Sequence, residues 1–353
     1  MKQKIIISRN LSAELIETVA SIHPDRIFVL TDEHTAVACW PYLFSIFSGH
    51  EGLGMPCQIT IRATDEAKNL DSLSEVWTCL VEGGATRHSL LINLGGGMVT
   101  DLGGFAASTF KRGIAYINIP TTLLAMVDAS VGGKTGINFR GLKNEIGVFN
   151  AANAVFLDTR FLATLDQTNF CSGYAEMIKH ALISDEMMLS ELFNYDLENP
   201  DFESLKKMIA QSVAVKERIV EEDPYEKGVR KALNLGHTVG HAFESLAMSQ
   251  GCPVLHGYAV AWGLVCELYL SAVLCGFPTN KLHQIAQFVH ETYGDFSFTC
   301  KEYELLYNLM LHDKKNTAGI INFTLLEEIG NICINKRASK DDIFEMLDYY
   351  REM

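Results

Sequence analysis

The stretch Leu90-Leu-Ile-Asn-Leu-Gly-Gly-Gly-Met-Val-Thr-Asp101 decides the fold of the first half of the chain. A short apolar run that ends in three glycines predicts a buried β-strand, and the residues after them predict a helix that begins near Asp101. Glycines at such a turn let the backbone approach a pyrophosphate, and a helix N-terminus favours an anion. The match to the dinucleotide-binding pattern is partial, because Thr100 stands at its last glycine position. A plain tight turn explains the glycines equally well.

Short β-rich runs alternate with helical patterns on both sides of this stretch, which predicts parallel βαβ units. The predicted strands are residues 4–7, 26–31, 58–62, 90–94, 116–119 and 154–157. From about residue 164 the apolar spacing becomes helical, over residues 172–183, 202–221, 227–248, 257–273 and 281–291. We therefore predict an α/β N-terminal domain with a Rossmann-like parallel sheet (1–160) and an all-helical C-terminal domain (161–353). Ligands of such sheets bind at the carboxyl ends of the strands.

Composition narrows the class of protein. The chain has 353 residues, 48% of them hydrophobic, and a formal net charge of −14, which disfavours nucleic acid and anionic membranes as partners. We find neither a secretory cleavage site nor a run of about 20 apolar residues. The nine cysteines are odd in number and form no Cys-x-x-Cys pair, which favours the reducing cytoplasm and argues against a cysteine-ligated metal.

A polar stripe is expected in the second half. Arg230, Asn234, His237 and His241 are spaced i, i+4, i+7 and i+11, which is one face of a helix, and Gly236 and Gly240 would let another element approach closely. The two histidines could hold a metal ion, contact a substrate or serve structure alone. The intervening glutamate of zinc proteases is missing, which disfavours that chemistry.

Two further groups of charged residues stand out. Glu176 and Lys179 share a helical face at i, i+3 among apolar neighbours; they form either a surface ion pair or a buried pair that needs a cation. The glycine-rich segment from Lys111 to Asn144 carries local positive charge, and within it Asp128 to Lys134 predicts an anion-binding loop, unless the lysines are simply solvated. A P-loop is rejected because Asp128 occupies the position of its first glycine.

Taken together, these motifs closely resemble the 3-dehydroquinate synthase family over about residues 90–330. The stretches that carry the resemblance are Gly95-Gly-Gly97, Pro120-Thr-Thr-Leu-Leu124, Val127-Asp-Ala-Ser-Val-Gly-Gly-Lys-Thr-Gly136, Lys143-Asn144, Ala175-Glu-Met-Ile-Lys179, Asn234-Leu-Gly-His-Thr-Val-Gly-His241, Leu255-His-Gly257 and Asp313-Lys-Lys315. Their order and spacing agree with the family, which implies its fold, its sugar-phosphate substrate and its assembly as a homodimer. Thr100, Asp65 and Tyr258 depart from the family pattern, where glycine, glutamate and glutamate are frequent.

The resemblance also implies the roles of individual residues. The implied ligands of zinc, or of cobalt in its place, are Glu176, His237 and His256. The implied NAD contacts are Asp32, Asp65, Lys68, Gly96, Gly97, Asp101, Thr121, Thr122, Asp128, Lys134, Lys143, Phe161 and Thr164. The implied catalytic and substrate-binding residues are Arg112, Asp128, Lys134, Asn144, Lys179, Lys216, Glu226, Arg230, Asn234, His241 and Lys315. For Asp32, taken without the resemblance, the structural alternative is a helix N-cap, which we favour.

The implied reaction eliminates phosphate from 3-deoxy-arabino-heptulosonate 7-phosphate and closes a carbocycle, with no net redox change, in the shikimate pathway. Such a substrate carries a phosphate and a carboxylate, so an acidic protein must gather Lys and Arg at one place. Three alternatives remain: another sugar-phosphate cyclase that makes an inosose or a valiolone, a metal-dependent alcohol or glycerol dehydrogenase, and a non-catalytic binding protein. The last would be expected to have lost part of the Glu176, His237 and His256 set.

Overall fold

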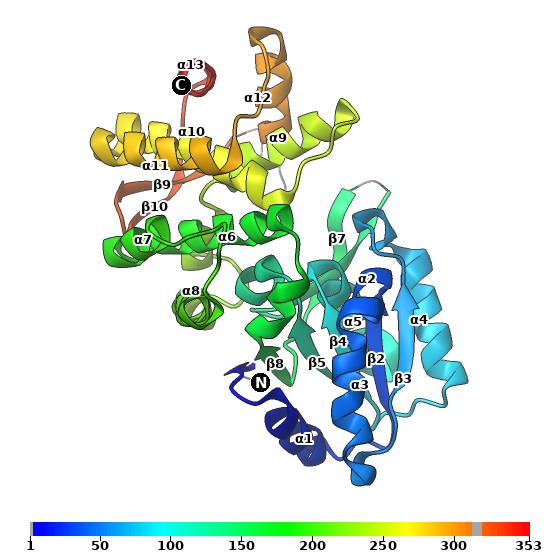
Figure 1. Cartoon of the computed structure of the whole chain (residues 1–353). Coiled ribbons are helices and arrows are strands. Elements are labelled where there is room, and N and C mark those ends of the chain that lie inside the picture. The colour runs from blue at the N-terminus through cyan, green and yellow to red at the C-terminus, as the bar shows by residue number, and fades with distance from the viewer. Residues whose placement is uncertain (1–2, 141, 313–319) are drawn as a thin grey trace. The chain divides into compact units, whose positions relative to one another are not determined.

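The computed structural model describes residues 3–140, 142–312 and 320–353 (Figure 1). The chain divides into two compact units. Unit 1 comprises Met1–Asp166 and Phe202–Lys206, and unit 2 comprises Gln167–Asp201 and Lys207–Met353. The α/β character expected of the first part is confirmed, and the second part, which was expected to be all helical, is mainly helical.

In the described part of unit 1, six parallel strands form one sheet in the order β1-β8-β5-β4-β2-β3. The strands are β1 (Lys4–Ile7), β2 (Ile27–Asp32), β3 (Cys57–Ile61), β4 (Leu90–Gly95), β5 (Ala115–Pro120) and β8 (Ala154–Leu157). All of them were predicted, with bounds correct to within one residue. β2, β4 and β8 are buried along their whole length, as expected of parallel strands covered on both faces.

The strand order has a switch point between β2 and β4. From β2 the chain moves outward to β3 on one side, and it then returns to β4 on the other side of β2 (Figure 1). Ligands of open parallel sheets bind outside the carboxyl ends of the strands at such a point. Asp32 ends β2 and Gly95 ends β4, so these two ends flank the place where a nucleotide is expected.

The helices of unit 1 mostly link these strands. They are α1 (Leu11–Ile22), α2 (Glu33–Ala38), α3 (Trp40–Ser48), α4 (Leu70–Glu82) and α5 (Gly97–Thr109), with short helices η1 (Glu51–Leu53), η2 (Asp65–Ala67), η3 (Phe110–Arg112), η4 (Ala125–Ala129) and η5 (Thr159–Thr164). The helix after the glycines begins at Gly97, one turn earlier than the predicted start near Asp101, because Gly96 is its N-cap. The glycines are therefore part of the helix start itself.

A two-stranded antiparallel hairpin, β6 (Lys134–Phe139) with β7 (Leu142–Phe149), was not predicted. Its glycines and lysines indicated an anion-binding loop. Gly136 and Gly147 face each other across the hairpin, and a Cβ on Gly136 would lie 2.5 Å from the Ile146 carbonyl oxygen. Here glycine permits close strand pairing rather than a turn.

Helices form most of unit 2. They are α6 (Gln167–Leu182), α7 (Glu186–Phe193), α8 (Phe202–Glu222), α9 (His237–Ser249), α10 (His256–Cys275), α11 (Thr279–Tyr293), α12 (Tyr303–Leu311) and α13 (Lys340–Glu352), with short helices η6 (Val229–Asn234) and η7 (Cys300–Glu302). The first residues of α8, Phe202–Lys206, belong to unit 1. The expectation of a wholly helical domain was wrong in one respect: β9 (Phe323–Glu328) pairs with β10 (Asn331–Lys336) in an antiparallel hairpin. Its buried strand contacts α10.

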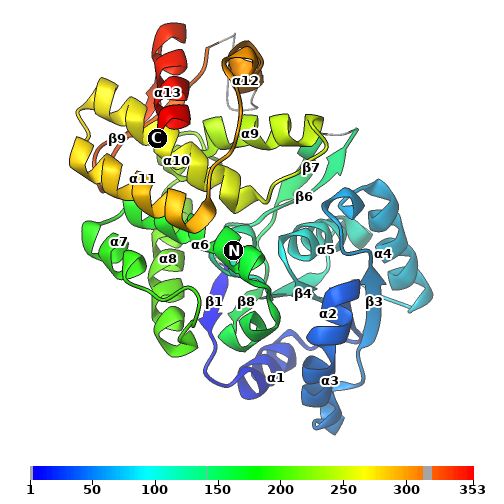
Figure 2. The same ribbon diagram turned by 45° about the horizontal axis from the view of Figure 1, so that its top comes forward.

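α10 is the central helix of unit 2, in contact with α6, α9, α11 and α13 (Figure 2). Among the described residues, this helix alone has the length and mean hydropathy that crossing a membrane requires. Since 67% of its apolar window is buried inside the protein, the apolar character of α10 is that of a core helix.

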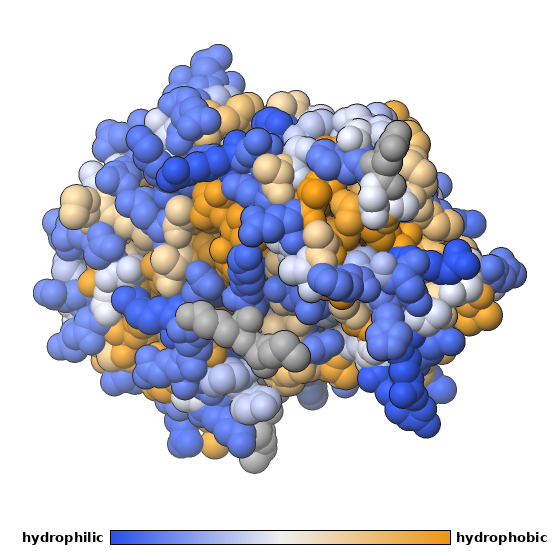
Figure 3. All heavy atoms as spheres, turned by 90° about the horizontal axis from the view of Figure 1, so that it is seen from below, coloured by the Kyte–Doolittle hydropathy of each residue, from blue (hydrophilic) through white to orange (hydrophobic). Residues whose placement is uncertain are grey.

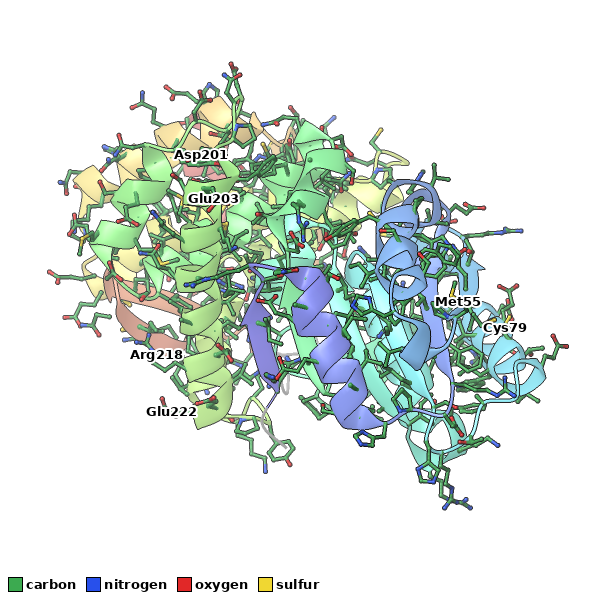
Figure 4. All side chains as sticks on the ribbon, turned by 60° about the horizontal axis from the view of Figure 1, so that its bottom comes forward. Met55, Cys79, Asp201, Glu203, Arg218 and Glu222 are labelled. Carbon is green, nitrogen blue, oxygen red and sulfur yellow. The ribbon has the colours of Figure 1, made fainter. Side chains whose placement is uncertain are left out.

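Polar side chains dominate the outer surface. Arg218 and Glu222, one turn apart on α8, are exposed and point outward in Figure 4. Hydrophilic residues cover most of the face seen in Figure 3, with hydrophobic areas between them. A hydrophilic face of this kind fits a chain with a net charge of −14.

Candidate functional site

Glu176, His237 and His256 come together within unit 2. The Nε2 atoms of His237 and His256 lie 3.4 and 3.6 Å from Oε1 of Glu176, and the two imidazole rings are 5.2 Å apart between centroids. One potential ligand atom from each of the three residues lies within 4.8 Å of the others. The three residues that the family resemblance implied as metal ligands are thus arranged as a cluster.

Helix packing through glycine sets these positions. Gly257 follows His256 on α10 and lies directly on α6: its N–H donates to Ser172 Oγ at 3.1 Å, and a Cβ would lie 1.8 Å from the Ser172 carbonyl oxygen. Ser172 is one turn before Glu176 on α6. The missing side chain at Gly257 therefore lets the start of α10 reach the helix that carries the carboxylate.

The predicted helix over residues 227–248 is broken, and that prediction was wrong. η6 ends at Asn234, Gly236 adopts a left-handed conformation with φ 79°, and α9 starts at His237. Arg230 and Asn234 therefore do not continue a helical face with the histidines. Only His237 and His241 keep their i, i+4 relation, with ring centroids 5.4 Å apart.

The expected close approach at Gly236 and Gly240 is confirmed. A Cβ on Gly240 would lie 2.8 Å from the Ala259 carbonyl oxygen, and one on Gly236 would lie 2.8 Å from the Leu264 side chain. Gly263 completes the contact, because its Cβ would lie 2.0 Å from the Gly236 carbonyl oxygen. α9 and α10 can therefore touch backbone to backbone, which brings their first residues, the two histidines, next to each other.

Hydrogen bonds fix which nitrogen of each histidine faces Glu176. Nδ1 of His237 lies 3.1 Å from the Leu235 carbonyl oxygen, which can only accept, so Nδ1 carries a proton and Nε2 is the nitrogen that faces Glu176. Nδ1 of His256 lies 3.2 Å from Oε2 of Glu244, a largely buried carboxylate on α9. Second partners of this kind orient metal-binding histidines.

Charge in the cluster is balanced locally. Lys179 contacts Oε2 of Glu176, and both side chains are buried. Burial alone would raise the pKa of Glu176, but Lys179 and His237 hold it well below its usual range. Burial alone would lower the pKa of His256, but Glu244 and Glu176 raise it to about 10. The cluster thus holds an ionised carboxylate that attracts positive charge.

This donor set suits a divalent metal ion. Two imidazole nitrogens and one carboxylate oxygen are the ligands of many catalytic zinc sites, and three protein ligands leave a position for substrate. The buried carboxylate of Glu176, fully enclosed by the protein, is stable only beside positive charge. A divalent cation bound here would supply this positive charge, and His256 would release its proton in order to bind the cation.

The other predicted residues of unit 2 differ in their surroundings. Lys216 and Arg230 are buried, and Arg230 Nη1 donates to the Pro224 carbonyl oxygen at 2.6 Å. Glu226, which the resemblance implied as part of the site, accepts a hydrogen bond from Asn234 Nδ2 at 2.9 Å. Lys315 lies outside the described residues.

In unit 1, several predicted NAD contacts gather at the carboxyl ends of β4 and β5. Gly96 and Gly97 start α5, and Thr121 and Thr122 follow β5 directly. Thr121 N–H donates to the Gly95 carbonyl oxygen at 3.0 Å, and a Cβ on Gly96 would lie 3.1 Å from Thr122 Cγ2. The glycines thus keep two strand ends close together beside a helix N-terminus.

Lys68 and Asp101 form a largely buried ion pair at 2.9 Å between Nζ and Oδ2. Asp32 is the N-cap of α2, the alternative that the sequence favoured: its Oδ1 accepts from Thr35 N–H at 2.8 Å. This bond leaves the ribose role of Asp32 as a prediction.

The remaining predicted residues of unit 1 lie on short segments. Arg112 has φ 70° at the end of η3, and Asp128 lies in the π-helical turn η4. The other positions are Lys134 at the start of β6, Lys143 and Asn144 on β7, and buried Phe161 and exposed Thr164 in η5. Asp65 begins η2, but its side chain lies outside the described part of the structure.

Sequence reasoning missed two buried carboxylates, Glu244 and Glu267, that hydrogen-bond around the histidines. Each stands in an otherwise apolar stretch of a helix whose burial is clear from the sequence. A carboxylate in such a place needs donors around it. That property could have marked both residues as parts of a site.

Known proteins place the chain in a family. Residues 58–172 match the model of the 3-dehydroquinate synthase N-terminal domain, and residues 173–316 match that of the C-terminal domain. A 3-dehydroquinate synthase of Parabacteroides distasonis is 52% identical over 351 residues, which are 99% of this chain and 98% of the relative. One of Listeria monocytogenes is 40% identical over 324 residues, 91% and 86% of the two chains.

Two solved structures share the fold. A 2-deoxy-scyllo-inosose synthase complexed with carbaglucose-6-phosphate, NAD⁺ and Co²⁺ superposes with a TM-score of 0.85 at 22% identity, covering 99% of this chain and 96% of that one. The 2-epi-5-epi-valiolone synthase of Streptomyces hygroscopicus with NAD⁺ and Zn²⁺ gives 0.86 at 24% identity, covering 100% and 97%. At such identities the likeness concerns the fold, whereas the two family models and the 52% identical relative establish that the chain belongs to the 3-dehydroquinate synthase family.

Proposed function

We propose that the protein is a 3-dehydroquinate synthase: a lyase that converts 3-deoxy-arabino-heptulosonate 7-phosphate into 3-dehydroquinate and phosphate. The observation that carries the proposal is the Glu176, His237 and His256 cluster in a chain that is 52% identical to a relative of that name. All three side chains are present and arranged to share one ion. A binding protein that had lost the chemistry would have no reason to keep them.

We further propose that NAD binds at the β2/β4 switch point of unit 1 and that the cluster of unit 2 holds Zn²⁺, with Co²⁺ as a substitute. When bound, NAD would take a hydride from a secondary hydroxyl carbon and later return it, while the cation would polarise the oxygen on that carbon. The glycine start of α5, next to the end of β4, supports the nucleotide site. The donor set supports the choice of ion.

The protein's own residues would bind and orient the substrate. Lys179, Lys216 and Arg230 are buried cations, with exposed fractions of 1, 6 and 2%. We assign them to the phosphate and carboxylate of the substrate, because both groups are anions of the kind that Lys and Arg side chains bind. His241, whose ring is 5.4 Å from that of His237 between centroids, is our candidate for moving the hydroxyl proton.

A single assay separates this function from its alternatives. Metal-loaded protein is incubated with the heptulosonate phosphate and a catalytic amount of NAD, and inorganic phosphate and 3-dehydroquinate are measured. A 3-dehydroquinate synthase releases both without net NADH. A dehydrogenase would accumulate NADH from a simple alcohol, and a cyclase for inosose or valiolone would turn over a sugar phosphate that lacks the carboxylate.

Two variants test the residue roles. We expect His237→Ala to lose the metal, because it removes a ligand, and Lys179→Ala to keep the metal and lose turnover. Metal content and rate are measured on both proteins beside the parent. Equal metal content in His237→Ala and the parent would be fatal to the ligand assignment.

We also propose a homodimer that acts in the cytoplasm without a membrane or nucleic acid partner. All nine cysteines are free thiols, as a reducing compartment requires. The hairpin β6–β7 exposes the apolar side chains of Phe139, Leu142, Ile146 and Phe149, which are of the kind that subunit interfaces cover. Analytical ultracentrifugation tests the assembly; a monomer at micromolar concentration would contradict it.

A further inference from the structure

Glu267 is a fully buried carboxylate on α10 that is not among the proposed ligands. Its Oε2 accepts a hydrogen bond from Gly236 N–H at 2.7 Å, and its Oε1 accepts from Thr238 and Val239 N–H at 2.9 and 3.1 Å. These donors belong to the N-terminus of α9, whose N-cap, Gly236, has no side chain of its own. Glu267 therefore caps a neighbouring helix, and its negative charge lies at the positive end of that helix.

The capped helix start leads directly to the candidate metal ligand His237. Gly236 N–H and the Leu235 carbonyl group belong to the same planar peptide group. Glu267 holds the N–H end of this group at 2.7 Å, and His237 Nδ1 donates to its oxygen end at 3.1 Å. Fixing the plane through its N–H thus fixes the direction of the oxygen that orients the imidazole ring.

We propose that Glu267 is a positioning residue for the metal centre, acting on His237 through the Leu235–Gly236 peptide group. The inference rests on the metal site of the proposed function. Each of the two histidines is then oriented by one carboxylate. Glu244 acts on His256 directly, with 3.2 Å between Oε2 and Nδ1, and Glu267 acts on His237 through one peptide group. Partners of metal-binding histidines commonly contribute to affinity in this way.

Local geometry explains why the cap comes from α10. Gly236 has φ 79°, and a Cβ there would lie 2.8 Å from Leu264 and 3.0 Å from the Val260 carbonyl oxygen, so no capping side chain fits. Gly263, one turn before Glu267, lets α10 approach the Gly236 carbonyl oxygen. Gly263 thus allows α10 to approach the start of α9, and Glu267, one turn later, supplies the hydrogen-bond acceptor.

The test is the metal affinity of Glu267→Gln, measured by competition with a chelator at a temperature where the variant is folded. Glutamine keeps the shape of the side chain but has one acceptor oxygen, so its NH2 group must face at least one of the three N–H donors. We expect Zn²⁺ to bind about 10–100-fold more weakly than in the parent. Asp185→Ala is the matched control, since it removes the N-cap of α7, which accepts from Met188 N–H at 2.9 Å, and should leave the Zn²⁺ affinity unchanged.

The outcomes separate this inference from the function on which it rests. If the parent binds Zn²⁺ and Glu267→Gln binds it within threefold of the parent, the positioning role is wrong and the proposed function stands. If the parent binds no divalent ion, both fail. Should Glu267→Gln not fold, ¹⁵N spectra of the zinc-loaded parent decide: His237, assigned by its absence from His237→Ala, must show a protonated Nδ1 and a metal-bound Nε2. A metal-bound Nδ1 overturns the inference.

Discussion

Replacing Gly257 by alanine should separate the metal ligands without touching any of them. Gly257 lies where α10 meets α6, next to His256 and one helical turn from the level of Glu176. An added Cβ would lie 1.8 Å from the Ser172 carbonyl oxygen, whereas ordinary contacts begin at 3.4 Å. Because the obstacle is backbone inside a helix, no side-chain rotation relieves it, and the two helices must move apart.

The size of that movement decides the result. Restoring an ordinary contact takes about 1.6 Å, the difference between 3.4 and 1.8 Å, while metal–ligand distances tolerate only about 0.2 Å. His256 moves with the start of α10, so one ligand should be lost. We expect Zn²⁺ affinity to fall at least about 100-fold, or ~2.7 kcal/mol, and stability to fall by about 1–3 kcal/mol from overpacking.

Chelator competition and thermal unfolding, measured on the same samples, separate these two effects. The control is Gly276→Ala at the C-cap of the same helix, where φ is 84° and an added Cβ meets no atom within 4 Å. That variant should cost about 1–2 kcal/mol of left-handed strain and keep the metal. If Gly257→Ala binds Zn²⁺ as the parent does, glycine-mediated packing does not place His256 and the reasoning is refuted.

Three further predictions concern the ligand partners and the nucleotide edge. Glu244→Gln should weaken Zn²⁺ binding about 10–100-fold, because the carboxylate next to His256 Nδ1 is lost. The control Glu186→Gln, at an exposed glutamate, should leave Zn²⁺ binding unchanged. Equal Zn²⁺ affinities of Glu244→Gln and the parent would contradict the role of Glu244. Since the pKa of His256 is raised to about 10, the metal-free site carries a proton at neutral pH, so the apparent Zn²⁺ affinity should rise as pH rises toward that value. Calorimetry near pH 7 should detect release of about one proton, and binding that is independent of pH would refute this. Asp101→Asn should weaken NAD binding, because it removes the ion-pair partner that holds Lys68. Fluorescence titration should show a higher Kd for NAD, with unchanged Zn²⁺ affinity. An unchanged Kd for NAD would exclude the Lys68–Asp101 pair from the NAD site.

The sheet could be predicted because each of its strands is a compact apolar run between turn residues. A parallel strand such as β4 is covered on both faces, so nearly all of its residues are apolar. It can therefore be recognised in the sequence without knowing which strands pair with it. The same reasoning offered a buried pair as one of two alternatives for Glu176 and Lys179, because the residues around them on the helix are apolar, and the structure has this pair buried. Burial is a local property of the sequence, and these predictions needed nothing more.

The start of α9 could not be predicted, because what determines it is distant in the sequence. A glycine inside a helix lowers helix stability by only about 1 kcal/mol. The helical spacing of the apolar residues therefore outweighed Gly236 and predicted a continuous helix over residues 227–248. The break is stabilised by Glu267, which accepts the Gly236 N–H across 31 residues, and by the contact with Gly263. His256 was likewise identified through the family resemblance, because its approach to Glu176 depends on Gly257 meeting Ser172.

The buried carboxylates around the histidines explain how the site tolerates Tyr258, which departs from the family pattern. In a position where the family frequently has glutamate, the Tyr258 ring packs against Trp262 and Tyr293, with centroids 6.0 and 5.2 Å away. That side of α10 is therefore an aromatic packing surface. The carboxylates that support the histidines come from other positions, Glu244 on α9 and Glu267 further along α10. Loss of a carboxylate at residue 258 is thus compatible with an oriented metal site, because each histidine has a buried acceptor arrangement of its own.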